Sequence, residues 1–341
     1  MKIQVPLPSE GMFVQPKNYS EALETVNSLA GSIGTLGRQA FISKDRASWQ
    51  KAQYLLYHWN SEELNRATPY GDYGRTVRHI LRNQLLAIQE ESLRKKLSPQ
   101  LKSFKDRPID QMLLELRERA HAHRINRHPL LQEMALHGLS SEGARLFLEN
   151  YYVNNHLFHL HIAALALAVP LEARVDIAQN FYDEMGEGDL SRAHPVLFLK
   201  IFDLAGRPDV IDPLPESLDL LNSKIYCGLL CGNAAIGLGG LGFLEMTMPT
   251  QMELILAGLK KSGFQDSELE FWSLHITLDA IHGDNWFESM SQIIKTPEDA
   301  RNALFGGLLI LDARASVYDA IWNVLSQDAI PGPKEIVRLN A

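Results

Sequence analysis

The chain has 341 residues and a formal net charge of −8, and 45% of its residues are hydrophobic against 22% charged. This balance is typical of a globular protein, and the negative charge disfavours nucleic acid as the main partner, because phosphate binding requires a basic surface. The N-terminus lacks the apolar segment of a signal peptide, no apolar run is long enough to span a bilayer, and two cysteines indicate no disulfide framework. We therefore expect a cytoplasmic protein without a membrane partner that acts on a small molecule.

Helical periodicity dominates the first part of the chain. Apolar residues recur at helical spacing from Tyr19 to about Leu97, residues 75–97 are predicted to form one long amphipathic helix, and another helix is predicted over 109–124. No catalytic cluster stands out here, so this part could pack on the rest, act as a lid or make the contact of a possible homodimer. We expect an all-α protein with an N-terminal helical segment over 1–125, a core over 126–330 and a tail over 331–341.

A helix predicted over 139–169 carries the first polar candidates. Glu149 and His156 lie seven residues apart, which places them on one face of a helix. Both could reach a central site, or they could be hydrogen-bonded polar residues of the core, or lie on the exposed side. Glu149 is our candidate ligand here, with His156 as the alternative.

The segment 172–204 combines acidic residues with two glycines. Gly186 and Gly188 lie between Glu184 and His194. Because a glycine inside a helix costs about 1 kcal/mol relative to alanine, we expect a locally distorted helix, which is a common place for a functional group. A solvated acidic turn is the alternative, although apolar residues on both sides indicate that the segment is packed.

The stretch from Cys227 to Glu245 is rich in glycine and alanine, which lets helices approach closely. It has no strand before it and no Lys-Ser/Thr after it, so it is not a phosphate loop. Glu245 is expected to end this apolar helix, just before Pro249. A buried, unpaired carboxylate is costly, so Glu245 either has a partner or is a solvated helix end.

The most informative stretch runs from Phe271 to Trp286 and contains His275, Asp279 and His282. Their spacing places all three on one helix face. Two imidazoles and a carboxylate are costly to bury without a partner, and a metal ion is the simplest one. The alternative is that they share a face by chance and the aspartate hydrogen-bonds a histidine. A last apolar helix over 300–325 is expected to close the bundle.

In chain order these candidates resemble the haem-oxygenase-like diiron oxidase superfamily of iron-containing redox enzymes, which is related to the thiaminase II and pyrroloquinoline-quinone synthase folds. The H-x3-D-x2-H helix is the most specific part, and His275 follows Glu245 by 30 residues, as the resemblance requires. The D-E-x-G-x-G-D…H segment from Asp183 to His194 also fits. The resemblance covers about 126–330 and implies a haem-oxygenase-like helical bundle, and the N-terminal third resembles an extra helical segment that some members carry.

The resemblance also implies a metal site and a reaction. The ligands of two Fe2+ ions would be Glu184, His194, Glu245, His275, Asp279 and His282, and some members add a carboxylate from the first core helix, for which Glu149 is the candidate. These donors suit iron or manganese, whereas thiolates would favour zinc. The implied activity is that of an O2-dependent oxidase or oxygenase acting through a peroxo-diferric species on a small amino acid, amine or related biosynthetic intermediate. Hydrogen abstraction, N-oxygenation and C–C cleavage all stay open.

Two other functions stay open at this point. One is a metal-free enzyme on the same bundle, like the thiaminase II or quinone synthase branches, although those lack this full ligand set. The other is a non-catalytic binding protein whose polar residues form a hydrogen-bonded core. Residues that could hold or surround a substrate, although surface charge and packing are their commoner roles, are Arg192, Lys224, Lys260, Tyr151 and Tyr152.

Overall fold

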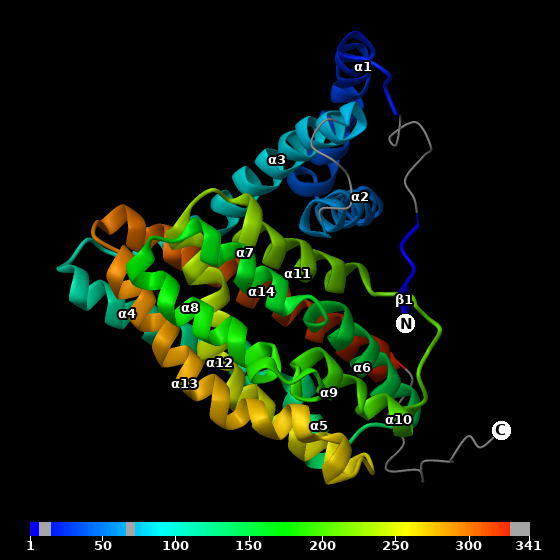
Figure 1. Ribbon diagram of the computed structural model, residues 1–341, viewed down its shortest axis with the longest axis vertical. Coiled ribbons are helices and arrows are strands. Elements are labelled where there is room, and N and C mark those ends of the chain that lie inside the picture. The colour runs from blue at the N-terminus through cyan, green and yellow to red at the C-terminus, as the bar shows by residue number, and fades with distance from the viewer. Residues whose placement is uncertain (7–14, 66–71, 328–341) are drawn as a thin grey trace. The chain divides into compact units, whose positions relative to one another are not determined.

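The computed structural model describes residues 1–6, 15–65 and 72–327, and these residues are almost entirely helical (Figure 1). The chain divides into two compact units, Gln4–Ser103 and a larger one that begins at Phe104 and includes Met1–Ile3. This division lies before the expected boundary at residue 125, because α4 (Ile109–Ala122) packs against helices of the larger unit. The expected tail over 331–341 lies outside the described residues.

The smaller unit is a set of helices joined by ion pairs. Its elements are α1 (Tyr19–Gly37), the π-helical turn η2 (Arg38–Ile42), α2 (Arg46–Asn65) and α3 (Tyr73–Ser103). Asn18 caps the N-terminus of α1, because its side chain accepts a hydrogen bond from the Glu21 backbone N–H at 3.0 Å. The Arg78–Glu62 pair, with 2.6 Å between nitrogen and oxygen, joins α3 to α2. The long helix predicted from residue 75 is therefore confirmed as α3.

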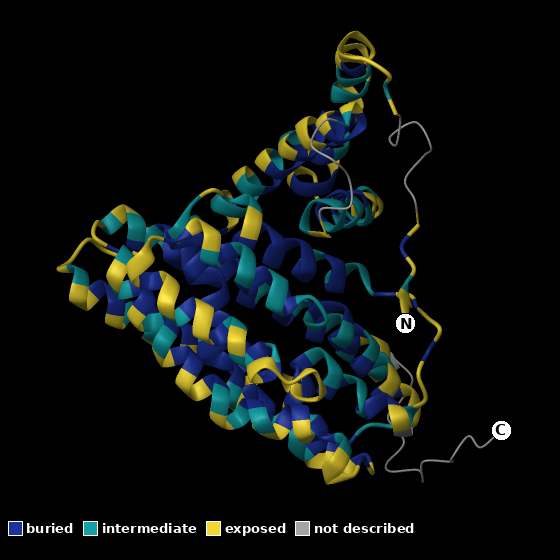
Figure 2. Ribbon diagram, in the orientation of Figure 1, coloured by how far each residue is buried: buried dark blue, intermediate teal, exposed yellow. Residues whose placement is uncertain are grey.

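The larger unit is built around α12 (Ala234–Lys261), which packs against α5 (Pro129–His137), α13 (Glu270–Ile293) and α14 (Pro297–Gln327). Every residue of α12 from Ala235 to Met248 is buried, as expected for a helix that is apolar on all sides (Figure 2). The other elements of this unit are η3 (Arg124–Arg127), α6 (Ser141–Asn155), α7 (Phe158–Ala168), α8 (Leu171–Glu184), η4 (Gly186–Gly188), η5 (Leu190–Arg192), α9 (His194–Leu199), α10 (Ile201–Ala205), α11 (Pro215–Ile225), η6 (Tyr226–Leu230) and η7 (Asp266–Glu268).

Glycine sets the distance between α12 and α14. A Cβ atom on Gly239 would collide with the Ala303 carbonyl of α14, and one on Gly306 would collide with the Ile236 carbonyl of α12. The two backbones are therefore in direct contact, as the small residues of this stretch predicted. None of the described helices has the length and apolarity needed to cross a bilayer.

Three sequence expectations for the helices were wrong in detail. The helix predicted over 139–169 is two helices, α6 and α7. The ring of His156 between them turns back onto the last turn of α6, with Nδ1 3.0 Å from the Tyr152 carbonyl oxygen. Glu245 lies in the middle of α12, which continues through Pro249. Although no strand was expected, β1 (Lys2–Ile3) pairs in parallel with β2 (Val210–Ile211).

Candidate metal centre

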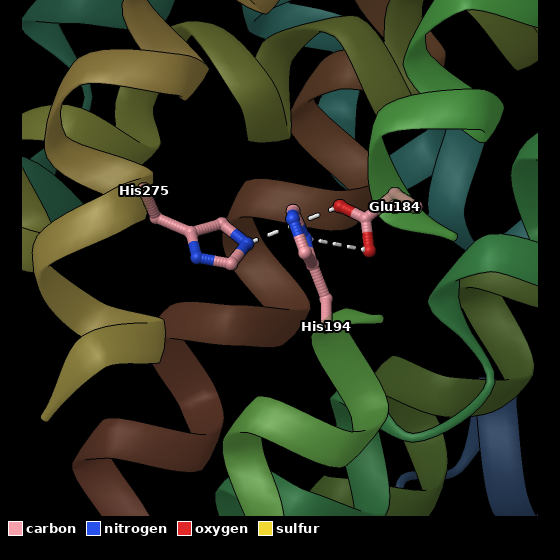
Figure 3. A group of neighbouring side chains, drawn as sticks. All are labelled: Glu184, His194 and His275. Atoms are coloured by element: carbon pink, nitrogen blue, oxygen red, sulfur yellow. Dashed lines mark ion pairs between the residues drawn. The ribbon is translucent and has the colours of Figure 1, made fainter. Parts of the chain in front are cut away.

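Six predicted ligands lie in two buried groups of three inside the larger unit. Within each group, one ligand atom from each residue lies within 4.8 Å of the others. The first group, or first triad, is Glu184, His194 and His275, which converge from α8, α9 and α13 (Figure 3). The second triad is Glu245, Asp279 and His282, from α12 and α13. Helix α13 contributes to both triads, and its three side chains in them are all buried.

A tight glycine turn brings Glu184 and His194 together. Glu184 is the last residue of α8 and His194 the first of α9, and both glycines between them adopt positive φ angles, 66° at Gly186 and 91° at Gly188. A Cβ atom on Gly186 would lie 2.5 Å from the backbone nitrogen of Ala193, so glycine is required for this close approach. The distortion predicted for this segment is therefore a turn that brings two candidate ligands together.

In the first triad, Nδ1 of His194 lies 3.0 Å from Oε2 of Glu184, and Nε2 of His275 lies 3.9 Å from Oε1 (Figure 3). The other ring nitrogen of His275, Nδ1, lies 2.5 Å from the Phe271 carbonyl oxygen, to which it donates. Burial alone would raise the pKa of Glu184, but His194 and His275 outweigh it and hold the pKa well below its usual range. Glu184 is therefore an ionised carboxylate between two imidazoles.

In the second triad, Nδ1 of His282 lies 3.7 Å from Oε2 of Glu245 and 3.8 Å from Oδ1 of Asp279. Burial alone would lower the pKa of His282, but the carboxylates of Glu245 and Asp183 raise it to about 9. Burial raises the pKa of Asp279 well above its usual range, and the nearby charge of Glu245 adds to this effect. Both shifts follow from carboxyl groups that are held close together in a buried site.

Sequence reasoning missed Asp183, which supports the second triad. Nε2 of His282 lies 3.0 Å from Oδ2 of Asp183, and Oδ1 of Asp183 accepts a hydrogen bond from Gln179 at 2.8 Å. A carboxylate that accepts the outer N–H of an imidazole fixes which nitrogen faces a metal. The only signal in the sequence was its position beside Glu184, which does not show where either side chain points.

Several buried polar atoms of the second triad have no hydrogen-bond partner among the described residues. They are Oε1 of Glu245, Oδ1 of Asp279 and Nδ1 of His282, whereas Nδ1 of His194 in the first triad meets Oε2 of Glu184 at 3.0 Å. Leaving such an atom unsatisfied costs about 1–3 kcal/mol, and a cation held by the second triad would satisfy all three. The donors are nitrogen and carboxylate oxygen, which suit iron or manganese. The residues present therefore fit a pair of such ions.

Two other candidate ligands lie apart from the triads. Glu149 accepts a hydrogen bond from Nε of Arg145 at 2.7 Å and belongs to neither group. His156, whose pKa is lowered to about 4 by burial, turns its Nδ1 to backbone carbonyls. Of the three basic candidates, Arg192 and Lys260 are about half exposed, whereas the expectation of a surface position was wrong for Lys224, which is fully buried.

A small pocket opens onto the first triad and includes none of the second. Besides its three ligands it is lined by aromatic and neutral polar side chains: Tyr152, Asn155, His156, Phe158, Phe198 and Phe271, with Pro195. A mostly apolar pocket with a few convergent polar groups is the usual form of a small-molecule site. We call this cavity the metal pocket.

The larger unit is a helical bundle that encloses two triads of histidine and carboxylate, which makes this chain a candidate metalloprotein. Comparison with known proteins identifies its family. Residues 145–315 match a family described as iron-containing redox enzyme, and the chain belongs to that family. None of the curated proteins compared with it matches.

Solved structures share the fold. A CADD-like protein of unknown function from Nostoc punctiforme superposes with a TM-score of 0.53 at 16% identity, covering 65% of this chain and 98% of that one. A TenA homolog from Pseudomonas syringae pv. tomato superposes with a TM-score of 0.51 at 14% identity, covering 62% and 92%. The expected haem-oxygenase-like helical fold is thereby confirmed.

Proposed function

We propose that this protein is a non-haem diiron oxidase that uses O2 as co-substrate. The observation that carries the proposal is the pair of buried triads of histidine and carboxylate, the second of which contains unsatisfied nitrogen and oxygen atoms. Membership of a family of iron-containing redox enzymes supports iron as the metal. Glu184, His194 and His275 would hold one ion.

The ligands of the other ion would be Glu245, Asp279 and His282. The bound irons would supply the electrons for O2 reduction and the oxidising power that acts on the substrate. The protein's own residues have separate tasks. The Phe271 carbonyl and the Asp183 carboxylate fix the ring nitrogens that His275 and His282 present to the ions.

The metal pocket would orient the substrate and exclude water. Its aromatic walls touch only the first triad, so the substrate would approach the ion held there. We propose a small amino acid, an amine or a related biosynthetic intermediate as the substrate class. Because Glu184 stays ionised between two imidazoles, it can remain a ligand as the charge of the centre changes.

Anaerobic loading with ferrous iron, followed by an iron count and stopped-flow mixing with O2, tests the proposal. We expect about two irons per chain and a transient visible absorbance that depends on O2. Clearly less than one iron per chain, together with no O2-dependent absorbance, would overturn it. A panel of amino acids, amines and fatty acids in the same experiment identifies the substrate class by its effect on the rate of the transient.

A further inference from the structure

The metal pocket is narrow as well as apolar. It has room for about one or two water-sized molecules beside the first triad. O2 is of that size, whereas an amino acid or an amine could reach the triad only if the walls of the pocket moved apart. In the absence of substrate, an oxidant formed at the first triad would therefore meet the side chains of these walls.

One ring of the pocket wall contacts the first triad directly, and it belongs to Phe271. Its centroid lies 4.1 Å from that of the His275 imidazole and 6.3 Å from that of His194, so it contacts two of the three candidate ligands. Phe271 is buried, and its backbone carbonyl accepts the hydrogen bond from Nδ1 of His275. Phe271 is therefore held beside the triad by its backbone and by its ring.

The other aromatic side chains that line the pocket make no ring contact with the first triad among the described residues. Tyr152 stacks on His156, with 4.9 Å between the ring centroids, and Phe158 contacts a histidine outside the triad. Phe198 contacts Phe271, with 5.1 Å between the centroids. Cysteine and methionine, which are common targets of oxidation, are absent from the described residues that line this pocket. Phe271 is thus the ring that an oxidant at the first triad would meet.

We propose that Phe271 is a site of self-oxidation, at which the iron-loaded protein hydroxylates its own phenyl ring when no substrate fills the metal pocket. One oxygen atom of O2 is inserted into a ring C–H bond, and the other takes up two protons and leaves as water. Two ferrous ions supply the two electrons and become ferric. This modification rests on the proposed diiron function, because the electrons come from the bound iron.

Tyr152 is the competing target in this wall, because a phenol is easier to oxidise than a phenyl ring. Proximity outweighs that difference, since a group held in place beside the reacting centre gains an effective concentration of up to about 10⁸ M. Phe271 has this advantage through its contacts with His275 and His194. The pocket also offers the space that an added oxygen atom needs.

Mass spectrometry of the full-length protein tests this site. The protein is loaded anaerobically with ferrous iron and is then exposed to ¹⁸O2 without substrate. We expect the modified chain to gain one ¹⁸O atom, and tandem mass spectrometry of its peptides should locate that atom on Phe271. Protein loaded with Zn2+, which supplies no electrons, should keep the unmodified mass, and so should iron-loaded protein that is kept anaerobic.

Two variants separate Phe271 from its surroundings. Phe271→Leu should bind iron and gain no oxygen at residue 271. Phe202→Leu is the matched control, because Phe202 packs against Phe198, with 6.0 Å between the ring centroids, and does not line the pocket. This control should be hydroxylated on Phe271 like the wild type. If Phe271→Leu fails to fold, the position of the oxygen atom in the wild type decides the assignment by itself.

Oxygen on Tyr152 or on another residue in place of Phe271 would overturn the assignment. An unchanged mass in protein that binds about two irons and shows the O2-dependent absorbance would also overturn it, and the proposed diiron function would survive that result. Clearly less than one iron per chain, with no O2-dependent absorbance, would overturn both. A substrate that fills the metal pocket should lower the yield of hydroxylated Phe271.

Discussion

The imidazole of His282 and the carboxylate of Asp183 are joined by a 3.0 Å contact between Nε2 and Oδ2 that crosses from α13 to α8. Glu184, the next residue along α8, points to the first triad instead. Successive side chains of a helix point about 100° apart, so two consecutive carboxylates can serve two different metal positions. One turn of α8 therefore supports both halves of the candidate centre.

This contact predicts the effect of Asp183→Asn. Loss of the carboxylate weakens the hydrogen bond that orients His282, and we expect a ten- to hundredfold lower affinity of the second triad for metal. The affinity is measured by competition with a chelator. Asp176→Asn is the matched control, because Asp176 also lies on α8 and accepts a hydrogen bond from Ser289 of α13 at 3.0 Å. An equal loss of affinity in both variants would contradict the positioning role.

Metal binding should stabilise the protein, because the bound ions balance the buried carboxylates. A metal at a hundredfold excess over its Kd adds about 2.7 kcal/mol to the free energy of unfolding. We expect Mn2+, which is redox-silent here, to raise the melting temperature of the wild type. In Glu184→Gln and in Glu245→Gln, metal analysis should find about half the wild-type content, since each variant loses one triad.

Glu149→Gln serves as the control for that experiment. Glu149 pairs with Arg145 outside both triads, so we expect this variant to keep the wild-type metal content. A metal content as low as that of Glu184→Gln would instead identify Glu149 as a ligand.

The glycine turn predicts a difference between two similar substitutions. Both glycines have positive φ angles, which cost an L-residue about 1–2 kcal/mol. A Cβ on Gly186 would also contact Ala193 and Arg192, whereas nothing lies within 4 Å of one on Gly188. Urea unfolding should therefore show a loss of about 1 kcal/mol in Gly188→Ala and at least about 2 kcal/mol more in Gly186→Ala. Equal losses would show that the turn tolerates the added atom.

His156 predicts how the stability of the metal-free protein depends on pH. Its pKa is lowered by burial from the usual 6.5 to about 4. Between these values the unfolded chain binds a proton that the folded protein does not, so the free energy of unfolding rises with pH across this window. The difference corresponds to about 3 kcal/mol. In His156→Gln, urea unfolding at several pH values should show a smaller rise of the free energy of unfolding with pH. An unchanged rise would show that other groups cause it.

The candidate ligands on α13 could be predicted from sequence because periodicity alone decides which residues share a helix face. Three residues at H-x3-D-x2-H spacing need no information from the rest of the chain. The position of Glu245 within α12 was harder to predict, since Pro249 usually marks the end of a helix. Here the proline only removes the hydrogen bond to the Glu245 carbonyl, and packing on all sides keeps the helix continuous.

Other parts of the site depend on contacts between distant segments. The role of Asp183 follows from His282, which lies 99 residues later. Lys224 was expected at the surface because of its charge, yet α11 is buried over nearly its whole length. Arg314 lies in a helix predicted only to close the bundle, and its hydrogen bond to the Tyr151 hydroxyl becomes visible only when α6 and α14 are side by side. Local patterns do not contain such information.

The metal pocket reaches the first triad and none of the second, so the two ions would have unequal lifetimes. An ion in the first triad, held by Glu184, His194 and His275, could leave through the pocket. An ion in the second triad, held by Glu245, Asp279 and His282, could leave only when the helices open. Brief exposure to a chelator would then leave a half-loaded protein. Refilling that form with a different metal would give a centre that contains two different metals, and the position of each metal would be known.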